Sequence, residues 1–224
     1  MPPFKLVIFD CDGVLVDSER ITNQIFIDML ADIGINITLQ EVMDNYVGIP
    51  LLDGLAILAK KHKINLPEGF VDRFNSKSLF AFENELQAIP GIMYVLAQIQ
   101  TPFCVASNSH PEKVSAMLKI TRLFDSFEGK IFTASLVKKP KPAPDVYIYA
   151  SQAFNINPSD CLVIEDSFVG VSAAKAAGMT VYGYSTHSSA KRLLDAGAHT
   201  VFDDMKDLPL LIHQYGILPY GTQI

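Results

Sequence analysis

The feature that most constrains the fold is a short apolar run, Leu6 to Phe9, that ends in two closely spaced carboxylates, Asp10 and Asp12, followed by Gly13. A continuous apolar run of this length is typical of a strand buried on both faces of a parallel sheet. In open α/β sheets, ligands bind beyond the carboxyl ends of the strands, and a spacing of two residues in extended chain places both carboxylates on one side. The run therefore predicts a functional site in which two neighbouring anions need a cation.

The composition allows two hydrophobic cores and argues against several classes of partner. The chain has 224 residues, of which 49% are hydrophobic, so it can form a core domain and a smaller accessory domain. A net charge of −6, with no basic run longer than 60–63, argues against binding to nucleic acid or to an anionic membrane. That run is typical of the last turn of a helix, and steering of an anionic substrate is the alternative. A monomer is compatible with all of these features.

The cysteines and the start of the chain indicate a reducing compartment. Cys11, Cys104 and Cys161 lie in or beside apolar strand candidates, without the spacing of metal ligands, so we expect reduced and buried thiols. The start of the chain has no signal-peptide pattern, and no apolar span approaches the ~20 residues that a membrane helix needs. We therefore expect a cytoplasmic protein.

The pattern after Asp17 becomes helical for about seventy residues. We predict four helices, which are one over 21–33 ending near Gly34, one that begins with the capping box Thr38-Leu39-Gln40-Glu41, one over 51–58, and one marked by Phe70, Phe74 and Phe82.

From Pro90 onward, strands and helices alternate, which predicts a parallel sheet. The expected strands are 103–106, 130–133, 162–165, 180–184 and an edge strand over 199–202. The expected helices are 92–99, 113–118, 144–154, 168–177, 189–196 and 205–213, with a frayed tail after Gly216.

The first strand belongs with strands that lie a hundred residues later, so the helical block is an insertion directly after the carboxylate pair. We predict a Rossmann-like α/β core of residues 1–16 and 89–224 and an inserted all-α cap of residues 17–88. A module tethered by only two crossings can move over the catalytic end of the sheet and exclude water.

Two further segments carry polar groups at the predicted edge. Ser107 and Asn108 follow a predicted strand, where a hydroxyl can hydrogen-bond an oxyanion together with backbone N–H groups. Taken alone, these residues before Pro111 are more typical of a helix N-cap. Lys141 lies among alternating prolines that hold an extended, stiff segment, but taken alone it is more typical of a solvated loop lysine.

The strand over 162–165 ends in Glu165 and Asp166, which precede a helix and could simply cap it. If the strands are parallel, however, these acids converge with Asp10 and Asp12, and such oxygen ligands suit Mg²⁺. The hydroxyl, amide and ammonium facing the metal would be those of Ser107, Asn108 and Lys141. This combination favours phosphoryl transfer.

Four motifs in this order resemble those of the haloacid dehalogenase-like superfamily, and together they span nearly the whole chain. They are Asp10-Cys11-Asp12-Gly13-Val14 with Asp17-Ser18-Glu19, then Ser107-Asn108, then Lys141-Pro142-Ala143-Pro144-Asp145, then Glu165-Asp166-Ser167 followed by Gly170. The first motif alone also resembles the start of a calcium loop. However, Val14-Leu15-Val16 replaces further oxygen ligands of an EF-hand, and Ile21 stands where its last glutamate would be.

The resemblance implies a role for each acid. Asp10 would be the nucleophile that forms an aspartyl-phosphate, and Asp12 would be the general acid and base. Asp10, Asp12 through its main-chain carbonyl, and Asp166 would hold Mg²⁺, with Glu165 either a ligand or the holder of a bound water. Dehalogenases of this group lack the second aspartate of the first motif, so Asp12 favours a phosphate substrate.

The resemblance also implies that Ser107, Asn108 and Lys141 hold the transferring phosphoryl group, and that Lys141 pairs with Asp10. Arg20 is a candidate contact for the non-reacting end of the substrate, and an exposed arginine on a solvated helix face is the alternative.

Members with a helical cap at this position include β-phosphoglucomutases, phosphoglycolate phosphatases and sugar-phosphate phosphatases. The mutases carry a histidine where Thr22 stands, and an arginine three residues after the glycine matching Gly48, where Leu51 stands. These departures favour a phosphatase of a small sugar phosphate or phospho-sugar acid, with a phosphomutase as the alternative and a non-catalytic binding module as a remote one. The stretches 9–13, 48–51 and 85–89 resemble the bacterial 6-phosphogluconate phosphatase type.

Overall fold

The structure is a computed structural model that describes residues 4–46, 51–186 and 188–213. The chain divides into two compact units. The core unit comprises the chain up to Asp17 and from Gln87 onward, and the helical unit comprises Ser18–Leu86. The boundaries expected from the sequence differ from these by one residue at the first crossing and two at the second.

The core unit is built on a six-stranded parallel sheet with the strand order β3-β2-β1-β4-β5-β6. The strands are β1 (Leu6–Phe9), β2 (Phe103–Ser107), β3 (Ile131–Thr133), β4 (Cys161–Glu165), β5 (Thr180–Tyr184) and β6 (Thr200–Phe202). β1 lies in the middle and all four of its residues are fully buried, which explains why its sequence is apolar without alternation. The predicted parallel α/β core is confirmed.

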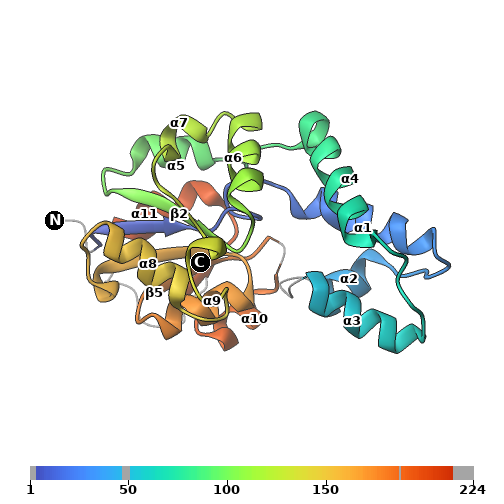
Figure 1. Cartoon of the computed structure of the whole chain (residues 1–224). Helices are drawn as coiled ribbons and strands as arrows, with labels where there is room; N and C mark the ends of the chain where they lie inside the picture. The colour runs from blue at the N-terminus through green and yellow to red at the C-terminus, as the bar shows by residue number, and fades with distance from the viewer. Residues whose placement is uncertain (1–3, 47–50, 187, 214–224) are drawn as a thin grey trace. The chain divides into compact units, whose positions relative to one another are not determined.

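Helices cover both faces of this sheet (Figure 1). One face packs on α8 (Asp145–Ala153), α9 (Phe168–Ala176) and α10 (Ala190–Ala196), with Leu6 and Ile8 in the shared core. The other face carries Phe9, whose ring lies 6.2 Å from that of Phe127. The helices of the core unit that remain are α5 (Ile92–Gln98), α6 (Pro111–Ile120), α7 (Phe124–Phe127) and α11 (Leu208–His213), with 3-10 turns η1 (Ala134–Leu136), η2 (Pro158–Asp160) and η3 (Met205–Asp207).

The described part of the helical unit consists of α1 (Glu19–Ala31), α2 (Leu39–Asn45), α3 (Leu51–His62) and α4 (Phe70–Glu85). The predicted capping box begins α2, since the Thr38 hydroxyl accepts from the Glu41 N–H at 3.2 Å and the Glu41 carboxylate accepts from the Thr38 N–H at 3.0 Å. The basic run predicted to end a helix supplies the last turn of α3. The helical unit has a separate hydrophobic core, which includes Phe26, Leu30 and Leu58.

The two chain segments that join the units are hydrogen-bonded to each other. Val16 and Ala88 form an isolated antiparallel bridge, and the Asp17 N–H donates to the Gln87 carbonyl at 2.9 Å. The crossings therefore run side by side at the boundary of the core unit.

Several local expectations differ from the structure. α6 begins at Pro111 with His110 as its N-cap residue, so Ser107 and Asn108 are not the cap. The short helix α7 had no signal in the sequence, and the last predicted helix is a 3-10 turn followed by α11. All three cysteines are free and buried, as predicted. Among the described helices, none combines the length and apolarity needed to cross a bilayer. Gly48 and the tail after Gly216 lie outside the described residues.

Candidate active site

Three neighbouring strands end at the same edge of the sheet and bring polar side chains together there. Asp10 directly follows β1, Ser107 is the last residue of β2, and Glu165 is the last residue of β4. Because the strands are parallel and adjacent, their carboxyl ends meet at one edge. This is the edge at which the sequence predicted a site.

Asp10, Glu165 and Asp166 form a compact acidic group. One carboxylate oxygen from each lies within 4.8 Å of those of the other two, which is close enough for one cation to contact all three. Glu165 and Asp166 are buried, and Asp10 is 8% exposed. Carboxylate oxygens are the ligands that hard divalent cations prefer, so the donor set fits Mg²⁺.

Lys141 is buried against two of these acids, not in a solvated loop. Its ammonium donates to Asp10 Oδ1 at 2.7 Å, to Glu165 Oε1 at 2.7 Å and to the carbonyl of Ala106 at 2.9 Å. An ammonium has three N–H donors, so these contacts use all of them. The predicted pairing of Lys141 with Asp10 is therefore present in the structure, and the lysine is held in one position.

The electrostatics of the group reflect burial of several like charges around one lysine. Burial raises the pKa of Asp10 to about 7, against the attraction of Lys141 and with added repulsion from Glu165 and Asp12. Burial acts to lower the pKa of Lys141, but attraction to Asp10 and Glu165 outweighs it and holds that pKa above its ordinary value. The carboxylates thus exceed the charge that one ammonium can balance, and a divalent cation would relieve the repulsion.

Glu165 is held by protein donors on both of its oxygens. Besides Lys141, Oε1 accepts from the Tyr147 hydroxyl at 2.8 Å, and Oε2 accepts from the N–H and the hydroxyl of Ser167 at 3.0 and 2.9 Å. Burial raises the pKa of Tyr147 well above its usual value, so this hydroxyl stays protonated and donates. A Cβ at Gly170 would overlap the Glu165 carboxylate, which therefore lies directly against the first turn of α9.

The helix cap that was the alternative explanation for these acids is made by their neighbour. The Ser167 hydroxyl accepts from the Gly170 N–H at 3.1 Å and caps α9. Glu165 and Asp166 are therefore not needed to cap this helix.

Asp12 points to a different set of partners from Asp10. Its Oδ2 accepts from the Ser109 hydroxyl at 2.9 Å, and its Oδ1 accepts from the Lys113 ammonium at 3.3 Å. Gly13, the next residue, has φ of +78°, and a Cβ there would overlap the Asp166 carboxylate. Glycine at this position lets the chain after β1 pass close to Asp166, the candidate metal ligand that follows β4.

The predicted phosphate-binding residues lie at this edge in different ways. Ser107 is buried and its hydroxyl accepts from the Ser109 N–H at 3.0 Å. The Asn108 amide accepts from the Lys141 N–H at 2.9 Å and donates to the Lys141 carbonyl at 3.2 Å. Asn108 thus fastens the backbone that carries Lys141, and direct phosphate contact by either residue stays a prediction.

Arg20 lies in α1 of the helical unit. Its guanidinium is 3.8 Å from the Glu85 carboxylate, and its side chain is 62% exposed. This is the geometry of an exposed helix-face arginine, and its contact with substrate stays a prediction.

The structure adds Ser109, Lys113 and Tyr147 to the site. Lys113 follows Ser109 by four positions, and Tyr147 follows Lys141 by six, two residues after the third motif. These spacings were visible in the sequence. Their importance was not, because each residue contacts an acid that is distant in the chain.

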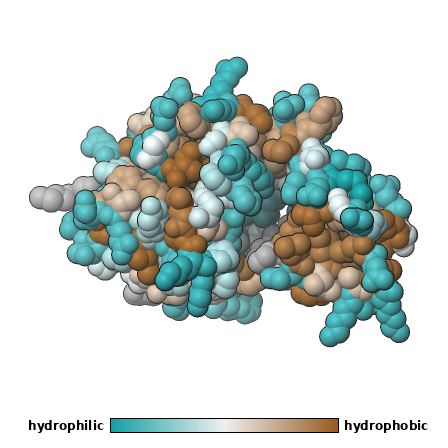
Figure 2. Space-filling view, viewed as in Figure 1, coloured by the Kyte–Doolittle hydropathy of each residue, from teal (hydrophilic) through white to brown (hydrophobic). Residues whose placement is uncertain are grey.

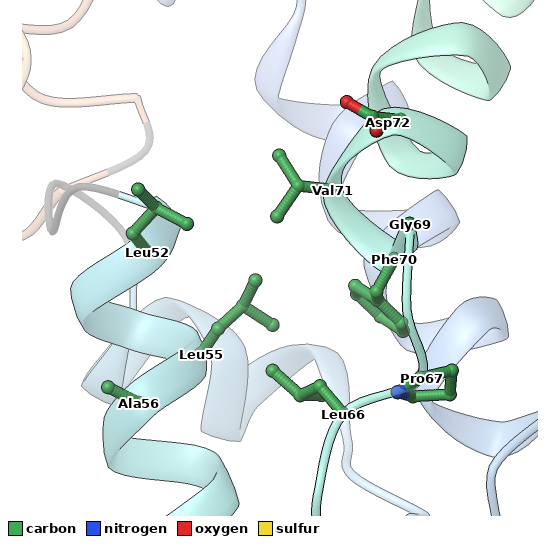
Figure 3. A pocket seen from close by; sticks show the side chains of 9 residues that line it. All are labelled: Leu52, Leu55, Ala56, Leu66, Pro67, Gly69, Phe70, Val71 and Asp72. Atoms are coloured by element: carbon green, nitrogen blue, oxygen red, sulfur yellow. The ribbon is translucent and has the colours of Figure 1, made fainter.

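A second concavity, in the helical unit, has different chemistry. Leu52 and Leu55 of α3 face Phe70 and Val71 of α4 across a cavity of about 380 Å³ (Figure 3). Hydrophobic side chains also reach the surface of this unit (Figure 2), among them Leu52 at 68% exposure. Among the described residues that line the cavity, Asp72 alone is ionisable, and these residues offer no donor set for a phosphate or a metal.

Comparison with known proteins shows the family to which the chain is similar. Residues 7–184 match the family model described as haloacid dehalogenase-like hydrolase. The chain is 29% identical to the 6-phosphogluconate phosphatase of Escherichia coli, over 94% of this chain and 96% of that protein. It is 31% identical to the phosphorylated carbohydrates phosphatase of Thermotoga maritima, over 87% and 92%.

A solved structure shows the same fold with a similar sequence. A conserved haloacid dehalogenase-like protein of unknown function from Agrobacterium tumefaciens superposes with a TM-score of 0.88, at 34% identity over 93% of this chain and 97% of that one. The four motifs, the strand ends that carry them and these matches lead to one conclusion: the chain belongs to the haloacid dehalogenase-like hydrolase family.

Proposed function

We propose that this hydrolase is a magnesium-dependent phosphatase that acts on a small sugar phosphate or phospho-sugar acid through an aspartyl-phosphate on Asp10. The observation that carries the proposal is the buried Lys141 ammonium, 2.7 Å from Asp10, which itself belongs to a group of three carboxylates. Such an arrangement can bring an anionic nucleophile and an anionic phosphate together. The names of the two relatives support this class of substrate.

The side chains of Asp10 and Asp166, with the main-chain carbonyl of Asp12, would hold the ion. When bound, Mg²⁺ supplies positive charge that neutralises the transferring phosphoryl group. Glu165 already accepts hydrogen bonds on both oxygens, which supports a role in holding Lys141. A direct contact of Glu165 with the ion would be its second role.

The chain's own residues then act in two steps. Asp10 attacks phosphorus, the ester P–O bond breaks, and the leaving oxygen takes a proton from Asp12. Water next attacks the aspartyl-phosphate, gives a proton to Asp12, and releases inorganic phosphate and free Asp10. Ser107, Asn108 and Lys141 would orient the phosphoryl group in both steps.

We further propose that residues 17–88 act as a cap that excludes water, with Arg20 as a contact for the non-reacting end of the substrate. The proposed compartment is the cytoplasm. The net charge of −6 supports small anionic metabolites bound through Mg²⁺, with neither nucleic acid nor membrane as a partner.

The test is release of phosphate from p-nitrophenyl phosphate with Mg²⁺, followed by a screen of phosphorylated metabolites that includes 6-phosphogluconate, phosphoglycolate and hexose phosphates. We expect turnover that EDTA abolishes and that Asp10→Asn eliminates, while the exposed Asp125→Asn retains it. Robust turnover by Asp10→Asn would remove Asp10 as the nucleophile. Absence of turnover by the natural sequence on every ester would support the binding-module alternative.

The phosphomutase alternative is tested with β-glucose 1-phosphate. The Thr22 hydroxyl, at the place of the mutase histidine, donates to the Ser18 carbonyl of its own helix at 3.0 Å, and Leu51 offers no cation. We therefore expect free phosphate as the product. Accumulation of glucose 6-phosphate without free phosphate would establish the mutase instead.

A further inference from the structure

Ser109 and Lys113 each bind a different oxygen of the Asp12 carboxylate. Ser109 donates to Oδ2 at 2.9 Å and Lys113 donates to Oδ1 at 3.3 Å. The Lys113 ammonium also donates to the Ser109 hydroxyl at 3.3 Å, which closes a three-membered network. A carboxylate held at both oxygens has lost the freedom to rotate about its side-chain torsions.

These contacts contribute little to the stability of the fold. The side chains of Lys113 and Asp12 are 32% and 23% exposed, so the ion pair is partly solvated. Pairs of this kind contribute at most about 1 kcal/mol to folding. The buried hydrogen bonds of Lys141 already hold the ends of the strands together. The main effect of the contacts of Ser109 and Lys113 is therefore to orient the Asp12 carboxylate.

The two donors are placed by one rigid segment. Ser109 follows the end of β2, and Lys113 lies in the first turn of α6, whose N1 residue is Pro111. The Ser109 N–H also donates to the Ser107 hydroxyl at 3.0 Å. The same segment thus positions a candidate phosphate-binding hydroxyl and the carboxylate that transfers the proton.

The chemistry of the two donors suits a group that changes its protonation state. A lysine ammonium can only donate, so it fixes Oδ1 as the acceptor oxygen. A serine hydroxyl can donate to a lone pair of Oδ2 and leave the acid proton of that oxygen available for the ester oxygen. Ser109 then continues to donate to Oδ2 after this proton has been transferred.

We propose that Lys113 and Ser109 are positioning residues that hold Asp12 in the orientation required for proton transfer to the leaving oxygen. This proposal rests on the role of Asp12 as general acid and base in the proposed function. In the first step, the proton leaves Asp12 Oδ2 for the ester oxygen as its bond to phosphorus breaks, and Ser109 then donates to the anionic Oδ2. In the second step, Oδ2 takes a proton from the attacking water.

The experiment compares p-nitrophenyl phosphate with phenyl phosphate, a matched pair that differs mainly in the need of its leaving group for a proton. General acid catalysis increases the rate about 10²- to 10⁴-fold, and a misoriented acid loses part of this increase. We expect Lys113→Met and Ser109→Ala to lower kcat/KM about 10-fold for phenyl phosphate but less than about 3-fold for p-nitrophenyl phosphate. Lys113→Arg should restore most of the activity, because arginine keeps a cationic donor.

Two controls separate positioning from general damage. Lys119→Met removes a lysine from the same helix, outside the network, and should leave kcat/KM for both esters unchanged. In an Asp12→Asn background, Lys113→Met should cause no further leaving-group bias, because the group that it positions is gone. All variants are checked for an unchanged melting temperature.

Equal losses for both esters, or the same extra loss in the Asp12→Asn background, would overturn the proposal, as would full activity of Lys113→Met and Ser109→Ala. Failure of the proposed function looks different. In that case the natural sequence releases no phosphate with Mg²⁺, or Asp12→Asn itself shows no leaving-group bias.

Discussion

Replacement of the proposed nucleophile by asparagine, Asp10→Asn, should stabilise the metal-free protein above neutral pH while it abolishes turnover. Asp10 is buried with Glu165 and Asp166, and Lys141 is paired with Asp10 and Glu165. Asparagine removes one of the crowded charges and keeps an oxygen that can accept from Lys141. The crowded carboxylates are therefore expected to lower the free energy of unfolding when no cation is present.

The magnitude follows from the pKa of Asp10, which rises from 3.8 to about 7 on folding, mainly through burial. Between these two values the folded protein holds a proton that the unfolded chain has released. Stability therefore falls as pH rises from about 4 to about 7, and is level above that range. A shift of about three pKa units corresponds to a loss of about 4 kcal/mol at about pH 8, which is the most that Asp10→Asn can recover.

The assay is calorimetric unfolding in EDTA at several pH values between about 5 and 8. For a chain of this size, about 4 kcal/mol corresponds to a rise in melting temperature of about 10 °C in the transition of the core unit. The difference between Asp10→Asn and the natural sequence should shrink steadily toward about pH 5. Saturating Mg²⁺ should raise the melting temperature of the natural sequence more than that of the variant.

The matched control is Asp125→Asn, which removes an exposed aspartate from α7 of the same unit. It should change the melting temperature by less than about 2 °C at every pH. Destabilisation by Asp10→Asn at about pH 8, or a gain that does not depend on pH, would refute the reasoning, because neither follows from the relief of a buried charge.

Two further substitutions test the surroundings of the acidic group. Tyr147→Phe removes the hydroxyl that donates to the buried Glu165 carboxylate at 2.8 Å. Urea denaturation should show a loss of about 1 to 3 kcal/mol in unfolding free energy. An unchanged unfolding free energy would mean that Glu165 finds another donor. Gly13→Ala places a Cβ against the Asp166 carboxylate at a backbone φ of +78°. Calorimetric titration should therefore show an Mg²⁺ affinity reduced about 10-fold or more. An unchanged Mg²⁺ affinity would remove Asp166 as a ligand.

The regular elements could be predicted because their signals are local in the chain. The continuous apolar run over 6–9 predicts a central strand, and Thr38 with Glu41 predicts the start of a helix, since each depends on neighbours within four positions. The helix cap that was the alternative for Ser107 and Asn108 is not formed, since His110 is the N-cap residue of α6. The same residue types serve caps and sites, and the choice was made by the backbone of Lys141, 33 positions from Asn108.

The acids and the lysine of the candidate site could be predicted, but the residues that hold these acids in position could not. Strand-end acids and a proline-framed lysine indicated Asp10, Asp166 and Lys141, because parallel strands end at one edge. Two contacts could be found only in the tertiary structure. Tyr147 holds Glu165 from within α8, and Lys113 reaches Asp12 across 101 positions.

The sequence by itself determined the fold class, the strand ends that carry the chemistry and the family, because apolar periodicity and ordered motifs are properties of the linear chain. Only the tertiary structure decided the state of each group. Lys141 is buried with all its donors used, Glu165 is held on both oxygens, and Asp12 faces Ser109 and Lys113. The physical reason is that burial, charge and hydrogen bonding at one point are set by residues that packing alone brings together.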